Sequence, residues 1–307
     1  MEKTSNDTYL RAQKIDSKII NNYGILENSI NLSLYSDDLF IDTDLEVYEN
    51  LDKSKSDRYE FILPRLKFTK NLENKTNLDG DFTFKSNNVI KNYQTNIFEK
   101  ININDLTFKS NPKISEKGFN NNYEFILKNA NTDSQNSNLY KQNENYYLGG
   151  LFQYNSSLPL VKEDKYFKNI LKPRIALKLS PKHTKDKSNS YTRLDINNIY
   201  EVNRLASDDS LEGGASITFG NEFTRIDNKT LKEKFSFKLA NNVRFADNND
   251  LPKTNQLGLK TSNLFGEISF SPNDYFKTNY NFAKKNNFED NTYESITTEL
   301  ITGKFKT

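Results

Sequence analysis

Residues 235–239 read Phe-Ser-Phe-Lys-Leu, so that large apolar side chains alternate with polar ones. The same alternation recurs in other runs, at 30–34, 39–47, 123–127, 175–179, 217–223 and 276–282. Successive side chains of a β-strand point to opposite faces of the sheet, so this period predicts strands with one apolar and one polar face. We find no apolar stripe of helical period and helix length. We therefore expect an all-β chain of roughly 12–14 strands joined by polar turns.

Strands of this kind suit two architectures. A soluble sandwich buries its apolar face in a core, whereas a transmembrane β-barrel turns that face to lipid and keeps a polar lumen. Only 35% of the 307 residues are hydrophobic, which is little for the core of a sandwich of this size. Composition therefore favours an antiparallel up-and-down transmembrane β-barrel meander.

Two long polar stretches, 130–145 and 181–190, lack the alternation and are expected to be loops facing water. Neither has the length of a linker between separate folds. We expect a single domain over residues 1–307. No apolar stretch follows Met1, so we expect no signal peptide within the chain.

Composition and motifs argue against several functional classes. The 43 Lys and Arg residues nearly balance the 41 Asp and Glu residues, so no net charge favours nucleic acid. The absence of Cys excludes disulfides and thiolate metal sites from the chain, and the single histidine, His183, falls in an expected loop. No P-loop, dinucleotide fingerprint or nucleophile-elbow motif is present. We expect no enzyme, no metal and no cofactor.

Residues 194–223 are predicted to form a hairpin around Asp208 and Asp209. A two-residue loop there sets Tyr200 opposite Ile217, with both side chains facing lipid. The other face is a polar lumen wall, whose named members are Glu201, Asn203, Glu212, Gly214, Thr218 and Gly220. Arg204 lies beside the turn on the lipid side, where its guanidinium is expected to reach the membrane interface.

Several short runs, taken in order along the chain, resemble one known family. They are 123–132 (Tyr-Glu-Phe-Ile-Leu-Lys-Asn-Ala-Asn-Thr), 148–151 (Leu-Gly-Gly-Leu), 171–181 (Leu-Lys-Pro-Arg-Ile-Ala-Leu-Lys-Leu-Ser-Pro), 194–204 (Leu-Asp-Ile-Asn-Asn-Ile-Tyr-Glu-Val-Asn-Arg) and 211–220 (Leu-Glu-Gly-Gly-Ala-Ser-Ile-Thr-Phe-Gly). Together they resemble the barrel domain of the lipopolysaccharide-assembly outer-membrane protein family, also called LptD or organic solvent tolerance protein. The resemblance covers nearly the whole chain and is most specific over 123–223.

The resemblance implies a translocon in the cell outer membrane that places lipopolysaccharide in the outer leaflet. It implies four kinds of partner: lipopolysaccharide itself, a lipoprotein that plugs the barrel, a periplasmic jelly-roll bridge protein, and outer-membrane lipids. It implies no covalent chemistry and no cofactor.

The chain departs from the family pattern in three ways. We expect neither a signal peptide nor a periplasmic jelly-roll domain within these residues, the family's cysteines have no counterparts, and the last residues, 303–307, lack a terminal aromatic. We therefore expect a barrel fragment without its C-terminal strands. A passive porin or gated receptor barrel remains an alternative, as does a soluble β-structured binding module.

Overall fold

The computed structural model describes residues 2–16, 22–54, 57–94, 96–182, 184–205, 207–302 and 305–306. His183, which the sequence places in a loop, lies outside these residues. The described chain is almost entirely β-structure, with one five-residue helix, α1 (Tyr9–Gln13). No helix in the described ranges is long and apolar enough to span a membrane.

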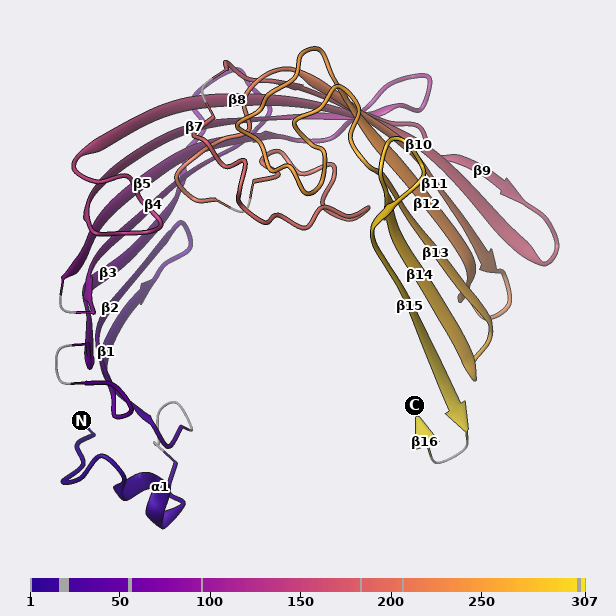
Figure 1. Ribbon diagram of the computed structural model, residues 1–307. Coiled ribbons are helices and arrows are strands. Elements are labelled where there is room, and N and C mark those ends of the chain that lie inside the picture. Colours follow the sequence, from indigo (N-terminus) through magenta and orange to yellow (C-terminus); the bar gives the residue numbers. More distant parts are fainter. Residues whose placement is uncertain are drawn as a thin grey trace. The chain divides into compact units, whose positions relative to one another are not determined.

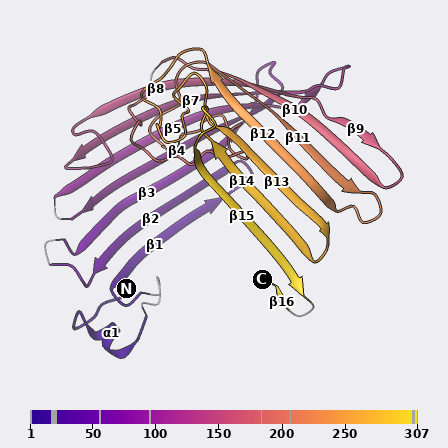
Figure 2. The same ribbon diagram turned by 45° about the vertical axis from the view of Figure 1, so that its right-hand side comes forward.

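The strands follow one another along the chain (Figures 1 and 2). They are β1 (Ile25–Tyr35), β2 (Leu39–Asn50), β3 (Tyr59–Leu72), β4 (Gly80–Tyr93), β5 (Ile97–Ser110), β6 (Lys113–Ile114), β7 (Asn120–Gln135), β8 (Asn145–Ser157), β9 (Leu160–Glu163), β10 (Phe167–Leu179), β11 (Ser216–Asp227), β12 (Glu233–Arg244), β13 (Leu264–Asn273), β14 (Phe276–Lys284), β15 (Asn291–Thr302) and β16 (Phe305–Lys306). Three of them, β6, β9 and β16, are four residues long or shorter.

The strands pair in chain order from β1 to β16, apart from the short β6 and β9, which pair with β7 and β10. The pairs whose registers are described are all antiparallel, for example β1 with β2 and β14 with β15. The all-β antiparallel meander expected from the two-residue period is therefore confirmed. Strands β1 and β16 are the two end members of this order, so the sheet is not closed within the described residues, as expected of an incomplete barrel.

The chain divides into two compact units, of which the first comprises residues 1–108 and 127–148. Its strands β5 and β7 share a polar face on which asparagine side chains bond to one another. Asn104 Nδ2 donates to Asn102 Oδ1 at 2.7 Å, and Asn131 Nδ2 donates to the same oxygen at 3.1 Å. Asn131 Nδ2 also donates to Asn129 Oδ1 at 2.8 Å. These amides give the sheet a polar face without net charge.

The second unit comprises residues 109–126 and 149–307 and carries β10–β15. Its registers place apolar side chains opposite one another on one face, which we call the apolar face. Leu171 pairs with Phe223, Phe223 with Phe237, Phe237 with Ile268, and Ile268 with Tyr280. Further along this face Phe219 is 48% exposed, and Ile175 and Leu171 of the neighbouring strand are also exposed, so the face presents an apolar patch. The expected segregation of apolar and polar faces is present in this unit.

The opposite face of β10–β13 is covered by two long connections within the same unit. We call residues 181–215, apart from 183 and 206, the covering segment; the other connection is 245–263 (Figure 1). Leu194 and Ile199 of the covering segment pack with Leu257 of the other connection. The strands contribute Ala240 and Phe265 to this core, and both are almost completely buried.

The predicted hairpin over 194–223 is wrong. Strand β11 pairs with β10 on one side and β12 on the other, with Ile217 opposite Leu177 and Val243. Its backbone hydrogen bonds are therefore satisfied without residues 194–205. Those residues instead bury apolar side chains against the sheet, and only the turn at Asp208 and Asp209 is found where expected. Tyr200 thus does not lie opposite Ile217.

Candidate functional site

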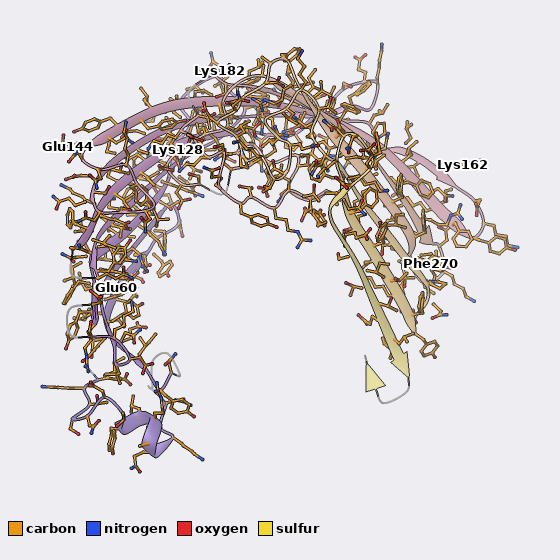
Figure 3. The ribbon with its side chains drawn as sticks, viewed as in Figure 1. Glu60, Lys128, Glu144, Lys162, Lys182 and Phe270 are labelled. Carbon is orange, nitrogen blue, oxygen red and sulfur yellow. The ribbon has the colours of Figure 1, made fainter. Side chains whose placement is uncertain are left out.

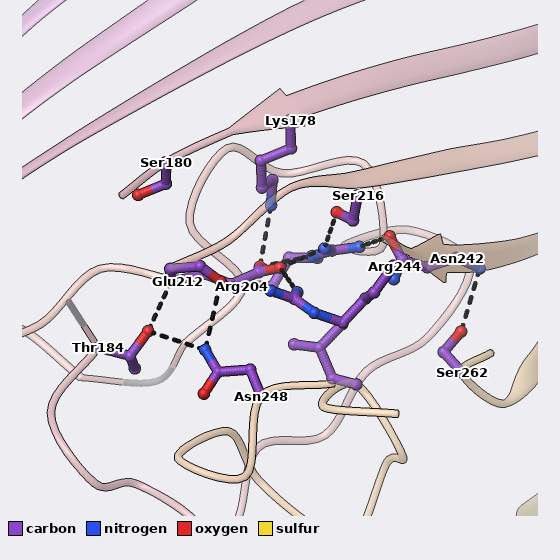
Figure 4. A network of polar contacts seen from close by, with 12 residues as sticks. Lys178, Ser180, Thr184, Arg204, Glu212, Ser216, Asn242, Arg244, Asn248 and Ser262 are labelled. Atoms are coloured by element: carbon purple, nitrogen blue, oxygen red, sulfur yellow. Dashed lines mark hydrogen bonds and ion pairs between the residues drawn. The ribbon is translucent and has the colours of Figure 1, made fainter. Parts of the chain in front are cut away.

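The site is a buried polar cluster between the covering segment and strands β10–β12 (Figure 4). Two strand residues, Lys178 on β10 and Arg244 on β12, point toward Arg204 and Glu212 of the covering segment. We call these four residues the Glu212 cluster. Their side chains are at most 3% exposed. Such burial is rare for charged groups unless they are paired, so the cluster organises this part of the fold.

Glu212 accepts hydrogen bonds from all three cations of the cluster. Arg204 Nε donates to Oε2 at 2.7 Å, and a second guanidinium nitrogen of Arg204 bonds Oε1. Lys178 Nζ lies 3.0 Å from Oε2, and Arg244 donates from one terminal nitrogen to Oε1 at 2.8 Å. Charge-assisted bonds of this kind are stronger than neutral ones, and the two-pronged arginine contact also fixes orientation.

Electrostatics in the cluster favour an ionised Glu212. Burial alone would raise the pKa of Glu212, but the charges of Arg204 and Lys178 outweigh that effect and hold this pKa well below its usual range. Three cations face one carboxylate, so the cluster carries excess positive charge. Backbone carbonyls offset part of that excess, since Lys178 Nζ donates to Glu201 O at 3.1 Å and Arg244 bonds Gly213 O.

Neutral polar side chains of the strands extend the cluster. Arg204 donates to Thr218 Oγ1 at 3.1 Å and to Asn242 Oδ1 at 2.9 Å. It also donates to Ser216 Oγ at 3.2 Å. Thr218 and Ser216 alternate along β11 with the exposed Phe219, so the polar face of this strand is the one that the covering segment occupies.

Gly214 allows the covering segment to rejoin the sheet beside the cluster. Ser180 and Gly214 exchange two backbone hydrogen bonds, of 3.1 and 3.0 Å. Gly214 has a φ of +91°, which side chains rarely adopt, and a Cβ there would lie 2.5 Å from a terminal nitrogen of Arg244. Glycine is therefore required both by the backbone and by the guanidinium.

A second ionic contact lies within the covering segment itself. Asp209 is 5% exposed, and its carboxylate lies 3.0 Å from Lys185 Nζ and 2.9 Å from Lys187 Nζ. Burial opposes ionisation of Asp209, but hydrogen bonds from Lys187, Ser207 and Lys185 prevail and lower its pKa from 3.8 to about 2. The turn at 208–209 is thereby held in place by two lysines.

Tyr200 packs its ring between Gly220 and Arg174. The guanidinium carbon of Arg174 lies 4.0 Å from the centre of the ring, a cation–π contact. A Cβ at Gly220 would lie 2.5 Å from the Tyr200 hydroxyl and 2.1 Å from Leu239 O. Burial raises the pKa of Tyr200 to about 12, so the phenol stays neutral. Gly220 therefore leaves room for Tyr200 of the covering segment to lie against β11.

The residues expected to form a lumen wall lie in different surroundings. Glu212, Gly214 and Thr218 meet in or beside the cluster, and Gly220 lies beneath Tyr200. The remaining two lie on the covering segment. Glu201 has an exposed side chain, and Asn203 bonds the backbone of Ser210 and Glu212. Whether any of these residues lines a lumen stays a prediction.

The expectation for Arg204 is wrong in position. Its guanidinium is completely buried against Glu212 and does not extend to a membrane interface. The expectation depended on the hairpin, in which Arg204 stood next to the turn on the lipid side. In the structure the carboxylate eight residues later binds the guanidinium, because burial makes a paired charge far more favourable than an unpaired one.

Sequence reasoning missed three members of the site, Lys178, Asn242 and Arg244. A signal for them exists in the alternation, since Lys178 falls between Leu177 and Leu179 on the polar parity of β10. Asn242 and Arg244 continue the polar parity of β12 in the same way. The alternation does not predict that the covering segment buries these three side chains.

The chemistry of the cluster is that of a structural fastening. The cluster links the covering segment to the sheet, and removal of one partner from such a buried pair costs about 3–5 kcal/mol because the other charge is then left buried and unpaired. Among the described residues, no group of three or more His, Cys, Asp or Glu side chains is placed to hold a metal ion.

Comparison with known proteins identifies the family. The family model LptD, described as LPS transport system D, matches residues 1–298, which is nearly the whole chain. No curated protein gives a significant match. The chain therefore belongs to the LptD family, whose members act in lipopolysaccharide transport at the outer membrane.

Proposed function

We propose that this chain forms part of the wall of a barrel translocon that delivers lipopolysaccharide to the outer leaflet. The single observation that carries the proposal is the segregation of the two faces of β10–β13. The apolar face bears exposed Ile175 and Phe219, as a surface in contact with lipid would. The opposite face bears paired charges, such as Lys238 and Glu267 at 2.7 Å, as a wet lumen would.

The lengths of the connections suggest which end of the strands faces the cell exterior. Outer-membrane barrels have short turns at the periplasmic end and longer loops outside. In the second unit the connections 228–232 and 274–275 are short, whereas 181–215 and 245–263 are long. We therefore assign the end that carries the Glu212 cluster to the extracellular side. The covering segment then lies in the lumen, against the wall, at the extracellular end.

Lipopolysaccharide is the proposed cargo. The protein partners of the chain are proposed from its membership of the family. A plug lipoprotein inside the barrel and a periplasmic jelly-roll bridge protein are proposed on that ground alone. A passive porin or gated receptor would share the two faces but would not carry lipopolysaccharide. The experiment below separates these two functions.

Photo-crosslinking in the native outer membrane tests the proposal. A photoreactive amino acid at Glu201, which is exposed on the covering segment, or at Asn281, on the polar parity of β14, should capture lipopolysaccharide or the plug lipoprotein. Thr218 is unsuitable because its hydroxyl is enclosed by Arg204 and Asn242.

Ile217, on the apolar face, is the matched control and should capture only bulk membrane lipid. Lipopolysaccharide adducts at Glu201 and Asn281 that depend on active transport would support translocation. Adducts in equal yield at all three positions would contradict the assignment of the faces. Absence of both lipopolysaccharide and plug-lipoprotein adducts from Glu201 and Asn281 would favour the porin.

A further inference from the structure

A groove of about 660 Å³ opens at the end of β10–β13 that lies away from the covering segment. Figure 3 labels Phe270, which lines this groove. The groove is lined by Phe167, Phe223, Arg225, Asp227, Lys234, Phe235, Phe270 and Pro272. Its apolar members come from four neighbouring strands, and none of its members belongs to the Glu212 cluster.

The walls of the groove are aromatic. Phe235 pairs directly with Arg225 on β11 and with Phe270 on β13, and its ring centre lies 6.1 Å from that of Phe223. These phenylalanines stand on the apolar face, which the proposed function turns toward lipid. A volume of several hundred cubic ångströms between aromatic rings suits a flexible hydrocarbon chain.

Two cations stand at the groove. Arg225 is exposed, and its Nε donates to Asn169 Oδ1 at 2.8 Å, while its terminal nitrogens bond no described residue. Its guanidinium carbon lies 5.3 Å from the centre of the Phe167 ring, and this contact orients the guanidinium group. Lys234 Nζ donates one hydrogen bond, to Pro272 O at 3.2 Å, and has further protons to donate.

The one carboxylate among the described residues that line the groove, Asp227, accepts hydrogen bonds from the turn that follows it. Asp227 Oδ1 accepts hydrogen bonds from the backbone nitrogens of Lys229 and Thr230 and from the Thr230 hydroxyl, at 3.0, 2.7 and 2.9 Å. Among the described lining residues, two cations therefore accompany one carboxylate. Two further carboxylates lie near them and are bonded elsewhere: Asp164, near Arg225, accepts from the backbone of Tyr166 and Phe167, and Asp274, near Lys234, pairs with Lys232 at 2.7 Å. Arginine binds phosphate through two parallel hydrogen bonds, and lysine binds it as a point charge.

We propose that this groove binds one glycerophospholipid of the periplasmic leaflet, with an acyl chain between the phenylalanines and the headgroup phosphate between Arg225 and Lys234. Charge complementarity and the apolar walls select this occupant over a free phosphate, which has no chain to fill the groove. The proposal rests on the proposed orientation of the faces and places the groove at the short-turn end, beside the headgroups of that leaflet. It assigns a lipid site that is separate from the route of lipopolysaccharide.

Tryptophan fluorescence tests this site, because the chain contains no tryptophan. Phe235→Trp places a single tryptophan, the reporter, in the groove of the 307-residue chain, held in maltoside micelles that contain no phosphate. The probes are a phosphatidylethanolamine and a diacylglycerol, each with dibrominated acyl chains and each at a low mole fraction. We expect the phospholipid to quench the reporter at least threefold more strongly than the diacylglycerol.

Variants identify the groups responsible. Arg225→Gln combined with Lys234→Gln should abolish the difference between the two probes. Lys260→Gln combined with Lys277→Gln removes the same charge from exposed positions outside the groove and should preserve the difference. Equal quenching by both probes, or a difference that survives loss of Arg225 and Lys234, would overturn the proposal. Absence of quenching even in micelles of brominated detergent would instead overturn the orientation of the faces.

Discussion

Arg204 and Glu212 are eight residues apart in the covering segment and form a completely buried two-pronged ion pair, with Arg204 Nε 2.7 Å from Glu212 Oε2. The pair joins two positions of the covering segment. Glu212 also pairs with Lys178 of β10 and Arg244 of β12, so the covering segment is bonded to two strands. The stability of the covering segment should therefore depend on this pair more than on any exposed charge.

Replacing Glu212 with Gln should release the covering segment. Three cations would then remain buried without a carboxylate, and breaking a buried pair costs about 3–5 kcal/mol. We expect proteases to cut within residues 184–205 of the intact protein in its membrane, where the parent resists cleavage. The exposed Glu233→Gln is the matched control and should resist as the parent does. Equal resistance of both variants would show that the pair does not hold the segment.

Because basic groups outnumber the carboxylate in the cluster, we expect the loss of Lys178 to cost much less stability than the loss of Glu212. Lys178→Met removes one buried charge while Arg204 and Arg244 still neutralise Glu212. Glu212 keeps both arginines, and burial of the additional Lys178 charge is itself costly, so the free energy of unfolding should change by less than about 1 kcal/mol. Arg204→Met should lower it by several times as much. Urea unfolding of the two variants in detergent checks this, and equal losses would contradict the assigned hierarchy.

Gly220→Ala should separate Tyr200 from the sheet. The new methyl group would meet Leu239 O at 2.1 Å, which is main chain and cannot turn aside. Overpacking of this kind costs about 1–3 kcal/mol, measured as a lower free energy of unfolding. The exposed neighbour Asn221→Ala should change it by less than about 0.5 kcal/mol. Tyr200→Phe should not rescue Gly220→Ala, because the backbone contact remains.

Acid should weaken the covering segment through Asp209. Its pKa is lowered from 3.8 to about 2 by Lys187, Ser207 and Lys185 against the effect of burial. A lowered pKa in the folded state adds stability that is fully present above about pH 4 and disappears as the pH falls through about 2. The contribution is about 2 kcal/mol. The pKa of Glu212 is also lowered, so its effect has the same sign.

Urea unfolding at several pH values between 2 and 5 measures this contribution. Asp209→Asn should lower the free energy of unfolding at pH 5 and should flatten its dependence on pH over this interval. Lys185→Met combined with Lys187→Met should flatten it in the same way, because the cations that lower the pKa are then gone. An unchanged slope in both variants would contradict the role of Asp209.

Alternation in the sequence predicts the positions of the strands. It does not predict the two connections that cover one face of the sheet. Alternation at 175–179, 217–223 and 235–239 correctly predicted β10, β11 and β12, because a strand with one lipid-like face needs a strict two-residue period. The stretch 130–135 was expected to be a loop, yet β7 continues to Gln135. Polar side chains there bond across the sheet, as Asn131 does to Asn102, so strand structure persists without apolar alternation.

The covering segment escaped prediction for a related reason. Leu194, Ile196, Ile199 and Val202 are spaced by two or three residues, which is close enough to alternation to suggest a strand. They are buried against other side chains of the unit, and no local rule distinguishes that outcome from pairing with β11. Which strand pairs with β11 depends on β10, whose own alternation competes for the same edge.

The central claim is that the apolar face of the sheet meets lipid and that the opposite face meets water or the covering segment. Because the 307-residue chain contains no cysteine, single nitroxide labels can be placed along its strand β11 in lipid vesicles. Labels at Ile217, Phe219 and Phe223 should collide more with oxygen, which dissolves in the bilayer, than with a water-soluble nickel chelate. The label at Glu222 should show the reverse. Accessibility that fails to alternate, or that favours the nickel chelate at 219 and oxygen at 222, would contradict the account.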